Sequence, residues 1–311
     1  MTMSQDQSTH SLAGLRVAFL GGGNMAGAMI KGLLQAKTGS PQTSASQPHG
    51  PTIYVAEPNP EARERLHSMV AKEARDQLQV FKGLDTLADE VSASNESIDW
   101  LVLAVKPQQA QASLTAVSQK AAALIAQSRL LSIAAGLPIG LLAQWSGHRR
   151  IVRAMPNTPA MIGEGACGAF ADPSIEMQER QQADAILSGT GELIWLTDES
   201  LIDAVTALSG SGPAYVFRMI EILRDAGTKL GLQKEESYRL AVQTFRGAIA
   251  LLEQSPEGPE ALRERVTSKG GTTQAALESM EALGLAKVLQ ESVKAAHARA
   301  KALATEAGKK T

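Results

Sequence analysis

The sequence is poor in aromatic residues, in cysteine and in unbalanced charge, and each shortage excludes a class of protein. Only 4% of its 311 residues are aromatic while 44% are hydrophobic, so Ala, Leu, Val and Gly must fill most of the core. Its single cysteine, Cys167, cannot form an internal disulfide, which is typical of a reducing cytoplasm. A formal net charge of −2 gives no sign of a nucleic-acid partner. We therefore expect a cytoplasmic protein with two domains or one large one.

Long apolar runs and histidine clusters are missing as well. No run approaches the roughly 18 apolar residues that cross a bilayer, and the polar N-terminus lacks the apolar core of a signal peptide. Five histidines are scattered over the chain, so the sequence predicts neither a membrane segment nor a metal site. Residues 1–14 are expected to be a disordered tail, and the Gly/Ser/Pro/Gln-rich stretch 38–51 a flexible surface loop.

Short apolar runs alternate with helical patterns in the first two thirds of the chain. Buried strands are expected at 15–20, 53–57, 100–107 and 129–136, because continuous apolar runs are typical of a parallel sheet covered on both faces. After about residue 199 only helical patterns remain, the clearest being 234–254, 272–283 and 285–303. The sequence therefore predicts an α/β region followed by an all-helical C-terminal region.

A glycine-rich turn follows the first expected strand. Gly21-x-Gly23-x-x-Ala26 fits the dinucleotide-binding pattern, in which the glycines allow a tight turn and a close approach of the pyrophosphate. The next helix would present free N–H groups and positive potential to the phosphates. The alternative is a plain tight turn, but the strand before it and the helix after it favour a cofactor site.

Three further segments are candidates for cofactor contacts. Glu57 ends the second strand, where a carboxylate would accept hydrogen bonds from ribose hydroxyls and repel a 2′-phosphate, favouring NADH over NADPH; the alternative is a solvated helix-cap acid. Lys106, in the AVKP turn after the third strand, could lie beside the cofactor or be a simple loop lysine. The small residues of SIAAG, 132–136, would let a flat nicotinamide approach.

A second glycine-rich segment, VTSKGGTTQ at 266–274, opens a helix near the C-terminus. Backbone N–H groups at such a helix start, with nearby hydroxyl groups, can bind a small carboxylate, although a helix cap without further function is the alternative. A dinucleotide turn and a carboxylate loop, with neither a nucleophile nor a metal cluster, suggest hydride transfer. Cys167 has no histidine nearby in sequence, so a buried, inert thiol is expected.

Taken in order, the motifs GGGNMA, VLAVKP, SIAAG, RAMPNTPAMIGEGA, LSGSGPAY and VTSKGGTT closely resemble those of pyrroline-5-carboxylate reductases. The resemblance runs from about residue 15 to 303. It implies an α/β fold with a Rossmann-type dinucleotide-binding domain, 15–198, followed by an all-helical C-terminal substrate and dimerisation domain, 199–311. It also implies NADPH or NADH as cofactor, pyrroline-5-carboxylate as substrate, and a homodimer or dimer-based decamer.

The resemblance also implies site residues, position by position. Cofactor contacts are expected at Leu20, Gly21, Gly22, Gly23, Asn24, Met25, Ala26, Glu57, Ala104, Val105, Lys106, Pro107, Ile133, Ala134 and Ala135. Substrate contacts are expected at Glu199, Val266, Ser268, Gly271, Thr272 and Thr273. Thr273 is the expected catalytic residue, hydrogen bonding near the ring nitrogen. Lys269, where a proline is common in the family, and Glu57, where many NADPH-using members have a small polar residue, depart from the pattern.

Two other functions compete with imine reduction. A β-hydroxyacid dehydrogenase would carry a lysine shortly after the glycine-rich turn that opens the helical region, but SGSGPAYVFRM has only Arg218. A non-catalytic NAD(P)-binding regulator would have no reason to keep a carboxylate loop.

Apolar residues also form one stripe along the last helix, and this stripe fits either a core or a subunit interface; its members are Leu285, Val288, Leu289, Val293, Ala296, Ala300 and Leu303.

Overall fold

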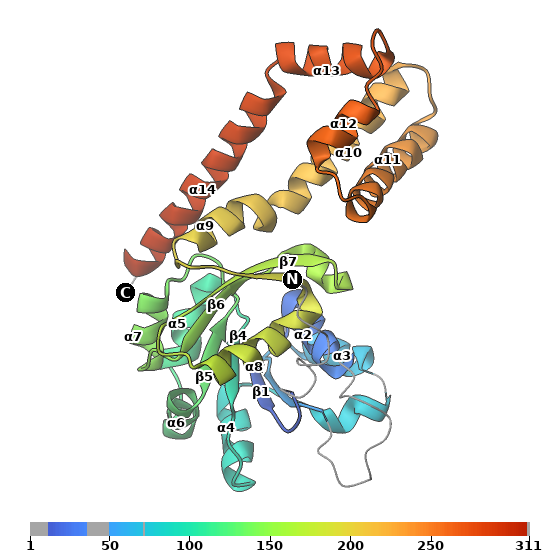
Figure 1. The fold of residues 1–311 in the computed structure, drawn as a ribbon. Helices are drawn as coiled ribbons and strands as arrows, with labels where there is room; N and C mark the ends of the chain where they lie inside the picture. The colour runs from blue at the N-terminus through green and yellow to red at the C-terminus, as the bar shows by residue number, and fades with distance from the viewer. Residues whose placement is uncertain (1–11, 36–49, 71, 310–311) are drawn as a thin grey trace. The chain divides into compact units, whose positions relative to one another are not determined.

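The computed structural model describes residues 12–35, 50–70 and 72–309 (Figure 1). Most of the expected tail, 1–11, and of the expected loop, 38–49, lies outside the described residues; Leu12 is buried in the core. The chain divides into two compact units, the first formed by the described residues up to 210 together with 297–309, and the second by 211–296. The expected domain limits, 15–198 and 199–311, stay a prediction.

The first unit is built on a mostly parallel sheet. Its strands are β1 (Arg16–Leu20), β2 (Thr52–Ala56), β3 (Leu78–Phe81), β4 (Trp100–Leu103), β5 (Arg129–Ser132), β6 (Ile151–Met155), β7 (Gly165–Ala171) and β8 (Gly191–Trp195). They lie in the order β3-β2-β1-β4-β5-β6-β7-β8. The chain runs outward from β1 in both directions, so the carboxyl ends of β1 and β4 form a topological switch point, where open α/β sheets bind ligands.

One pair of strands departs from the expected parallel arrangement, because β6 and β7 are antiparallel. Their connection, 156–164, holds only the short 3₁₀ helix η2 (Thr158–Ile162). A parallel pair needs a crossover of a dozen or more residues, whereas a short connection returns the chain in the opposite direction. β8 then follows the helix α8 (Met177–Leu187) and pairs parallel with β7.

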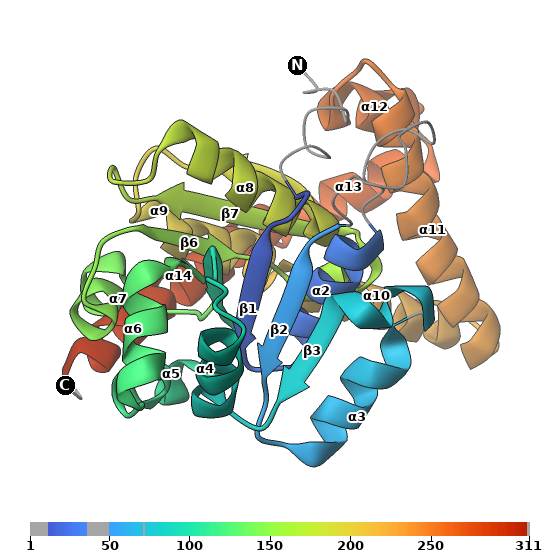
Figure 2. The ribbon, with the colours of Figure 1, turned by 90° about the horizontal axis from the view of Figure 1, so that it is seen from below.

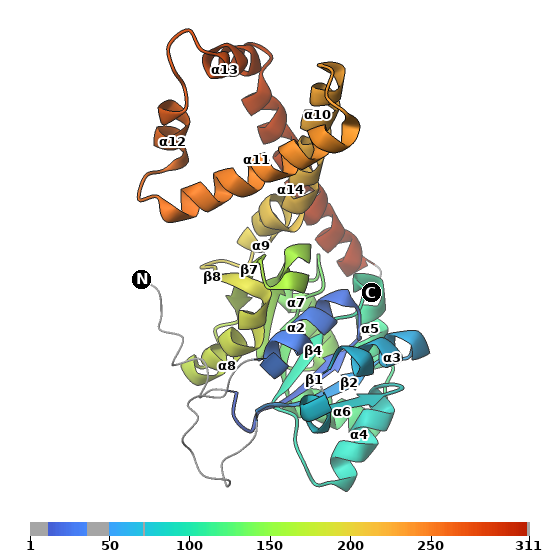
Figure 3. The ribbon, with the colours of Figure 1, turned by 90° about the vertical axis from the view of Figure 1, so that its right-hand side faces the viewer.

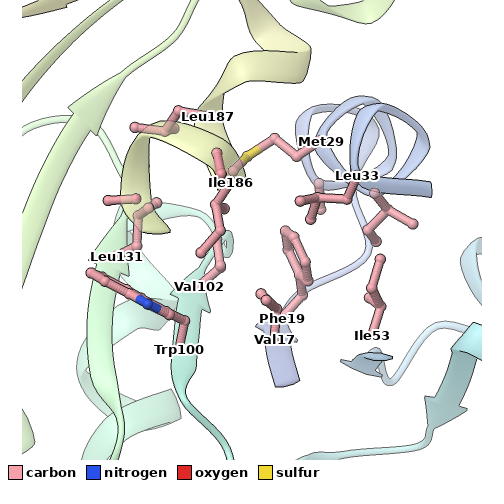
Figure 4. Close-up of a cluster of buried hydrophobic side chains, with 14 of the residues drawn as sticks. Val17, Phe19, Met29, Leu33, Ile53, Trp100, Val102, Leu131, Ile186 and Leu187 are labelled. Carbon is pink, nitrogen blue, oxygen red and sulfur yellow. The ribbon is translucent and has the colours of Figure 1, made fainter. Parts of the chain in front are cut away.

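Helices cover both faces of this sheet (Figure 2). Side chains of β1 alternate between two cores, since Val17 and Phe19 belong to one cluster while Ala18 and Leu20 belong to the other. The first cluster includes residues of α2 (Asn24–Gln35), α3 (Pro60–Met69) and α8, and Figure 4 shows Phe19 there with Met29 and Ile186. The second includes residues of α4 (Leu84–Ala93), α5 (Pro107–Thr115), α6 (Gln119–Gln127) and α7 (Ile139–Ser146).

The rest of the chain is helical, as expected. α9 (Leu201–Val205) and a π-helical turn (Thr206–Gly210) end the first unit's main segment. The second unit holds α10 (Gly212–Lys229), α11 (Lys234–Gln254), α12 (Pro259–Arg265) and α13 (Thr272–Ala282), seen in Figure 3. α14 (Leu285–Lys309) begins in the second unit, but its residues from 297 onward pack with the first. Within the described segments, no helix combines the length and apolar character needed to span a bilayer.

Candidate cofactor and substrate sites

The segments expected to bind cofactor follow four neighbouring strands of the sheet. Residues 20–26 end β1 and open α2, Glu57 follows β2, 104–107 follow β4, and 133–135 follow β5. These strands lie side by side in the order β2-β1-β4-β5, and all run parallel. Their carboxyl ends therefore meet at one edge of the sheet, which places all the expected cofactor residues in one region.

The turn after β1 has the backbone that the glycine pattern predicts. Gly21 has φ +98°, and a Cβ there would lie 2.9 Å from the carbonyl oxygen of Ala104, so both conformation and space require glycine. α2 then begins at Asn24 and has no acidic side chain in its first turn. A Cβ at Gly23 would meet open space. The positive end of α2 is thus open to an anion such as the pyrophosphate of a dinucleotide.

Glu57 is tied to this turn rather than free in solvent. Its side chain is 9% exposed, and its Oε2 accepts from the backbone N–H of Gly22 at 2.6 Å. Its Oε1 accepts from the backbone N–H of Asn59 at 2.8 Å. The cap of α3 is Asn59, whose side chain accepts from the N–H of Ala62. The alternative of a solvated helix-cap acid at Glu57 is therefore wrong.

Two arginines of α3 reach the same place. Arg63 donates through Nη1 to the carbonyl oxygens of Glu57, at 2.9 Å, and Pro58, at 2.7 Å. Arg65 donates through Nη2 to the carbonyl oxygen of Gly22 at 3.0 Å. The contact between Arg65 and Gly22 joins residues 43 positions apart, so no local sequence pattern indicates it. Two guanidinium groups thus border the end of β2 and the glycine turn.

The loops after β4 and β5 are each joined to the neighbouring strand, β1 and β4 respectively, by a main-chain hydrogen bond. Ala104 N–H donates to Leu20 O, and Ile133 N–H donates to Leu103 O. Lys106 is exposed and is the N-cap residue of α5; both interpretations of its side chain stay open. The SIAAG loop ends at Gly136, whose φ is +74°, and a Cβ there would lie 3.3 Å from the Cβ of Leu303 in α14. The end of α14 therefore packs against the loop expected to face the nicotinamide.

Glu199 lies in the first unit, where its carboxylate accepts two hydrogen bonds. Its Oε1 accepts from the N–H of Ile139 at 2.7 Å, and from Nη1 of Arg153 at 3.0 Å. Arg153, on β6, is only 4% exposed, and no sequence motif marks it. The carboxylate of Glu199 thus holds the start of α7, directly after the SIAAG loop. Its expected role in substrate binding stays a prediction.

The expected substrate loop lies in the second unit, between α12 and α13. The turn is closed by Gly271 N–H donating to Ser268 O at 3.0 Å, and by Gly270 N–H donating to the side chain of Gln274 at 2.7 Å. Gly271 is the N-cap residue of α13 and offers no side-chain cap. The first N–H groups of α13, including those of Thr272 and Thr273, have no intrahelical acceptor and suit a carboxylate. Ser268 is exposed and Thr273 half-buried.

The Cys167 thiol and the metal-ligating side chains of the described residues were the other candidates for chemistry. Cys167 is 2% exposed, and burial raises the pKa of its thiol to about 12. A thiol in this environment is not a nucleophile at neutral pH. Among the described residues, His, Cys, Asp and Glu side chains form no group of three or more that could hold a metal ion.

Comparison with known proteins accounts for nearly the whole chain. A family model described as pyrroline-5-carboxylate reductase dimerisation matches residues 199–303, and one described as NADP oxidoreductase coenzyme F420-dependent matches 16–136. The curated pyrroline-5-carboxylate reductase of Pseudomonas aeruginosa is 38% identical over 94% of this chain and 98% of its own length. That of Arabidopsis thaliana is 34% identical over 93% and 95%.

Solved structures agree. The pyrroline-5-carboxylate reductase of Coxiella burnetii superimposes with a TM-score of 0.77 at 31% identity, over 92% of this chain and 97% of that one. The pyrroline carboxylate reductase of Plasmodium falciparum with NADP bound gives 0.72 at 27% identity, over 94% and 99%. The resemblance seen in the motifs is thereby confirmed: the chain belongs to the pyrroline-5-carboxylate reductase family of NAD(P)-dependent oxidoreductases.

Proposed function

We propose that this protein reduces 1-pyrroline-5-carboxylate to L-proline with NADPH or NADH, the last step of proline biosynthesis. The proposal rests on two features that occur together in one chain of this family. One is a glycine turn at the switch point of a parallel sheet. The other is a glycine- and hydroxyl-rich helix start suited to a small carboxylate.

Residues at the carboxyl ends of β1, β2, β4 and β5 would hold the cofactor. The open N-terminus of α2 and the turn 21–23 fit its pyrophosphate, and Glu57 and the α3 arginines lie where the adenosine ribose binds in this fold. The small residues 133–135 leave room for the flat nicotinamide. When bound, the reduced cofactor supplies the hydride that the reaction needs.

Residues of the second unit would bind the substrate. The N–H groups of Thr272 and Thr273 can hold its carboxylate beside Gly271, whose own N–H closes the turn on Ser268 O. The hydroxyl groups of Ser268 and Thr273 can add hydrogen bonds, and Val266 can contact the ring. A protonated imine is already a good electrophile, so no strong general acid is required. Orientation of two reactants can then supply up to roughly 7–11 kcal/mol in ideal cases. Hydride transfer to the protonated imine leaves a neutral secondary amine. Thr273 would hydrogen bond near this ring nitrogen and relay to it the proton from water that gives the ammonium form of the product.

The proposed assembly is a homodimer formed through the helical region, either alone or as the unit of a decamer. Between residues 211 and 296, all of which are described, Ala241 is the only buried apolar residue. Large apolar side chains such as Phe217, Leu240 and Ile249 are more than half exposed there. Apolar surface of this extent is typical of an interface rather than of a monomer's exterior. The match to a dimerisation model over 199–303 supports the same assembly.

Steady-state kinetics test the reaction. Purified protein should oxidise NADPH or NADH only when pyrroline-5-carboxylate is present, with one L-proline formed for each cofactor oxidised. A β-hydroxyacid dehydrogenase would instead reduce a cofactor with a β-hydroxy acid, and a regulator would bind cofactor without turnover. A folded protein that oxidises neither cofactor with this imine would contradict the proposal.

A further inference from the structure

We infer that Arg63 and Arg65 form a binding site for the 2′-phosphate of NADP(H), which makes α3 the element that selects the phosphorylated cofactor. This inference deepens the proposed function and rests on it. Glu57 alone, as a residue ending β2, suggests a site that repels this phosphate. The contacts around Glu57 change that expectation.

The two arginines lie at the end of β2 and at the glycine turn. In Rossmann-type sheets the residue at the end of β2 lies beside the 2′ position of the adenosine ribose, and a nearby arginine accommodates a 2′-phosphate. Arg63 is anchored to the carbonyl oxygens of that residue, Glu57, and of Pro58. Arg65 is anchored to the glycine turn at Gly22 O. Both guanidinium groups are therefore held beside the end of β2 and the glycine turn, which border the adenosine ribose in this fold.

The guanidinium groups of Arg63 and Arg65 keep N–H donors that can bind an anion. A guanidinium has five N–H donors in a fixed fork, a geometry that matches phosphate oxygens. The anchoring bonds use Nη1 of Arg63 and Nη2 of Arg65. Within the part of the chain that the structure describes, the other Nη of each arginine has no hydrogen-bond partner. Each side chain is thus fixed in place by one nitrogen and keeps another for an incoming anion.

The carboxylate of Glu57 is already bound to the main chain. Both carboxylate oxygens already accept hydrogen bonds from main-chain N–H groups, at 2.6 and 2.8 Å, and the residue is 9% exposed. The formal charges of Glu57, Arg63 and Arg65 sum to +1. Glu61 and Glu64 of the same helix are exposed and make no bond to these groups among the described residues, so solvent screens them. The balance beside the ribose therefore favours a phosphate.

Binding measured without substrate tests the inference. Calorimetric titration of the full-length protein with NADP⁺ and NAD⁺ would be repeated with an R63Q/R65Q double variant. Losing charged hydrogen bonds should raise the Kd for NADP⁺ about ten- to a hundredfold, while the Kd for NAD⁺ should stay within about twofold. Arg75→Gln is the matched control, since it removes one exposed positive charge from the 3₁₀ helix Lys72–Gln77, which follows α3, without touching the turn. It should leave both constants nearly unchanged.

Two outcomes would overturn the inference. An unchanged NADP⁺ to NAD⁺ ratio in the double variant would mean that the arginines do not contact the phosphate. A parallel loss of both cofactors would mean that they only hold the glycine turn. If the double variant does not fold, the wild-type protein still decides the matter, because 2′,5′-ADP should bind at least about tenfold more tightly than 5′-AMP; equal affinities would reject the site. Since no imine is present, a failure of the proposed reaction would appear separately, as phosphate-selective binding without turnover.

Discussion

Thr273 is the residue on which the proposed chemistry depends most. It lies in the first turn of α13, and we propose that its N–H group and its hydroxyl group contact the carboxylate and the ring nitrogen of the substrate. Thr273→Ala removes one hydrogen bond to a polar or charged group, which is worth about 1.5–3 kcal/mol. We expect kcat/KM for the imine to fall roughly ten- to a hundredfold, while the Kd of the cofactor is retained.

Thr244→Ala is the matched control for this variant. Its hydroxyl donates to the carbonyl oxygen of Leu240 within α11, far in sequence from the loop, so its loss should leave kinetics nearly unchanged. A fall in kcat alone for Thr273→Ala would place the bond in the transition state, and a rise in KM alone would mean uniform binding. Weaker cofactor binding with normal catalysis would show that the substrate and cofactor ends are assigned wrongly.

Glu57 is expected to support the glycine turn for either cofactor. The carboxylate of Glu57 accepts hydrogen bonds from the backbone N–H groups of Gly22 and Asn59. In Glu57→Gln, the amide NH₂ group would face one of these two donors and leave it without an acceptor. A buried donor left unpaired costs about 1–3 kcal/mol, so the affinities for NADP⁺ and NAD⁺ should fall together. Titration calorimetry measures both. A selective gain for NADP⁺ would instead support repulsion of the 2′-phosphate, the interpretation that follows from the sequence alone.

Among the elements, the SIAAG loop depends most closely on a distant segment. Gly136 has φ +74°, and a Cβ there would approach Leu303 of α14 at 3.3 Å. A left-handed backbone costs a non-glycine residue roughly 1–2 kcal/mol, to which the close contact adds. Gly136→Ala should therefore lower the free energy of unfolding by about 1–2 kcal/mol or more and, because the loop is expected to face the nicotinamide, reduce turnover as well.

Gly140→Ala, four residues further along the chain, should have the opposite effect on stability. Gly140 lies inside α7, its φ is not positive, and a Cβ there would meet open space. Alanine should stabilise this helix by about 0.5–1 kcal/mol. Chemical denaturation of the two variants compares them directly. Equal effects at both positions would show that neither the backbone of Gly136 nor its contact with α14 is constrained.

The sequence predicts elements best where burial makes them continuous and apolar. β1, β2 and β4 are fully or almost fully buried, and their runs indicate strands directly. β3 and β8 lie at the sheet edges, where exposed positions interrupt the apolar pattern, so the sequence does not predict them as strands. The bonds of Arg65 to Gly22 and of Arg153 to Glu199 join segments far apart along the chain, and no local pattern encodes them.

For the whole molecule, the two units differ in how they bury apolar side chains. The first has two extensive cores on the faces of its sheet. In the second, α10, α12 and α13 have no buried residue at all. Helices in proteins owe most of their stability to the packing of an apolar face, so helices with so little buried surface need a partner. The apolar stripe at the start of α14 fits this pattern, because Leu285 and Val288 are 44% and 59% exposed.

A charge placed on this surface should separate the subunits. Phe217 on α10 is 62% exposed in the single chain, and Phe217→Glu would bury a carboxylate without a partner in the proposed interface, at a cost of several kcal/mol. Light scattering should give at least twice the chain mass of 32.8 kDa for the wild type and a smaller assembly for the variant. Met177→Glu is the control, since Met177 on α8 is 80% exposed and lies in the first unit. If Phe217→Glu keeps the wild-type mass at micromolar concentration, α10 does not lie at the centre of the interface; a wild type that is itself monomeric would reject the helical dimer.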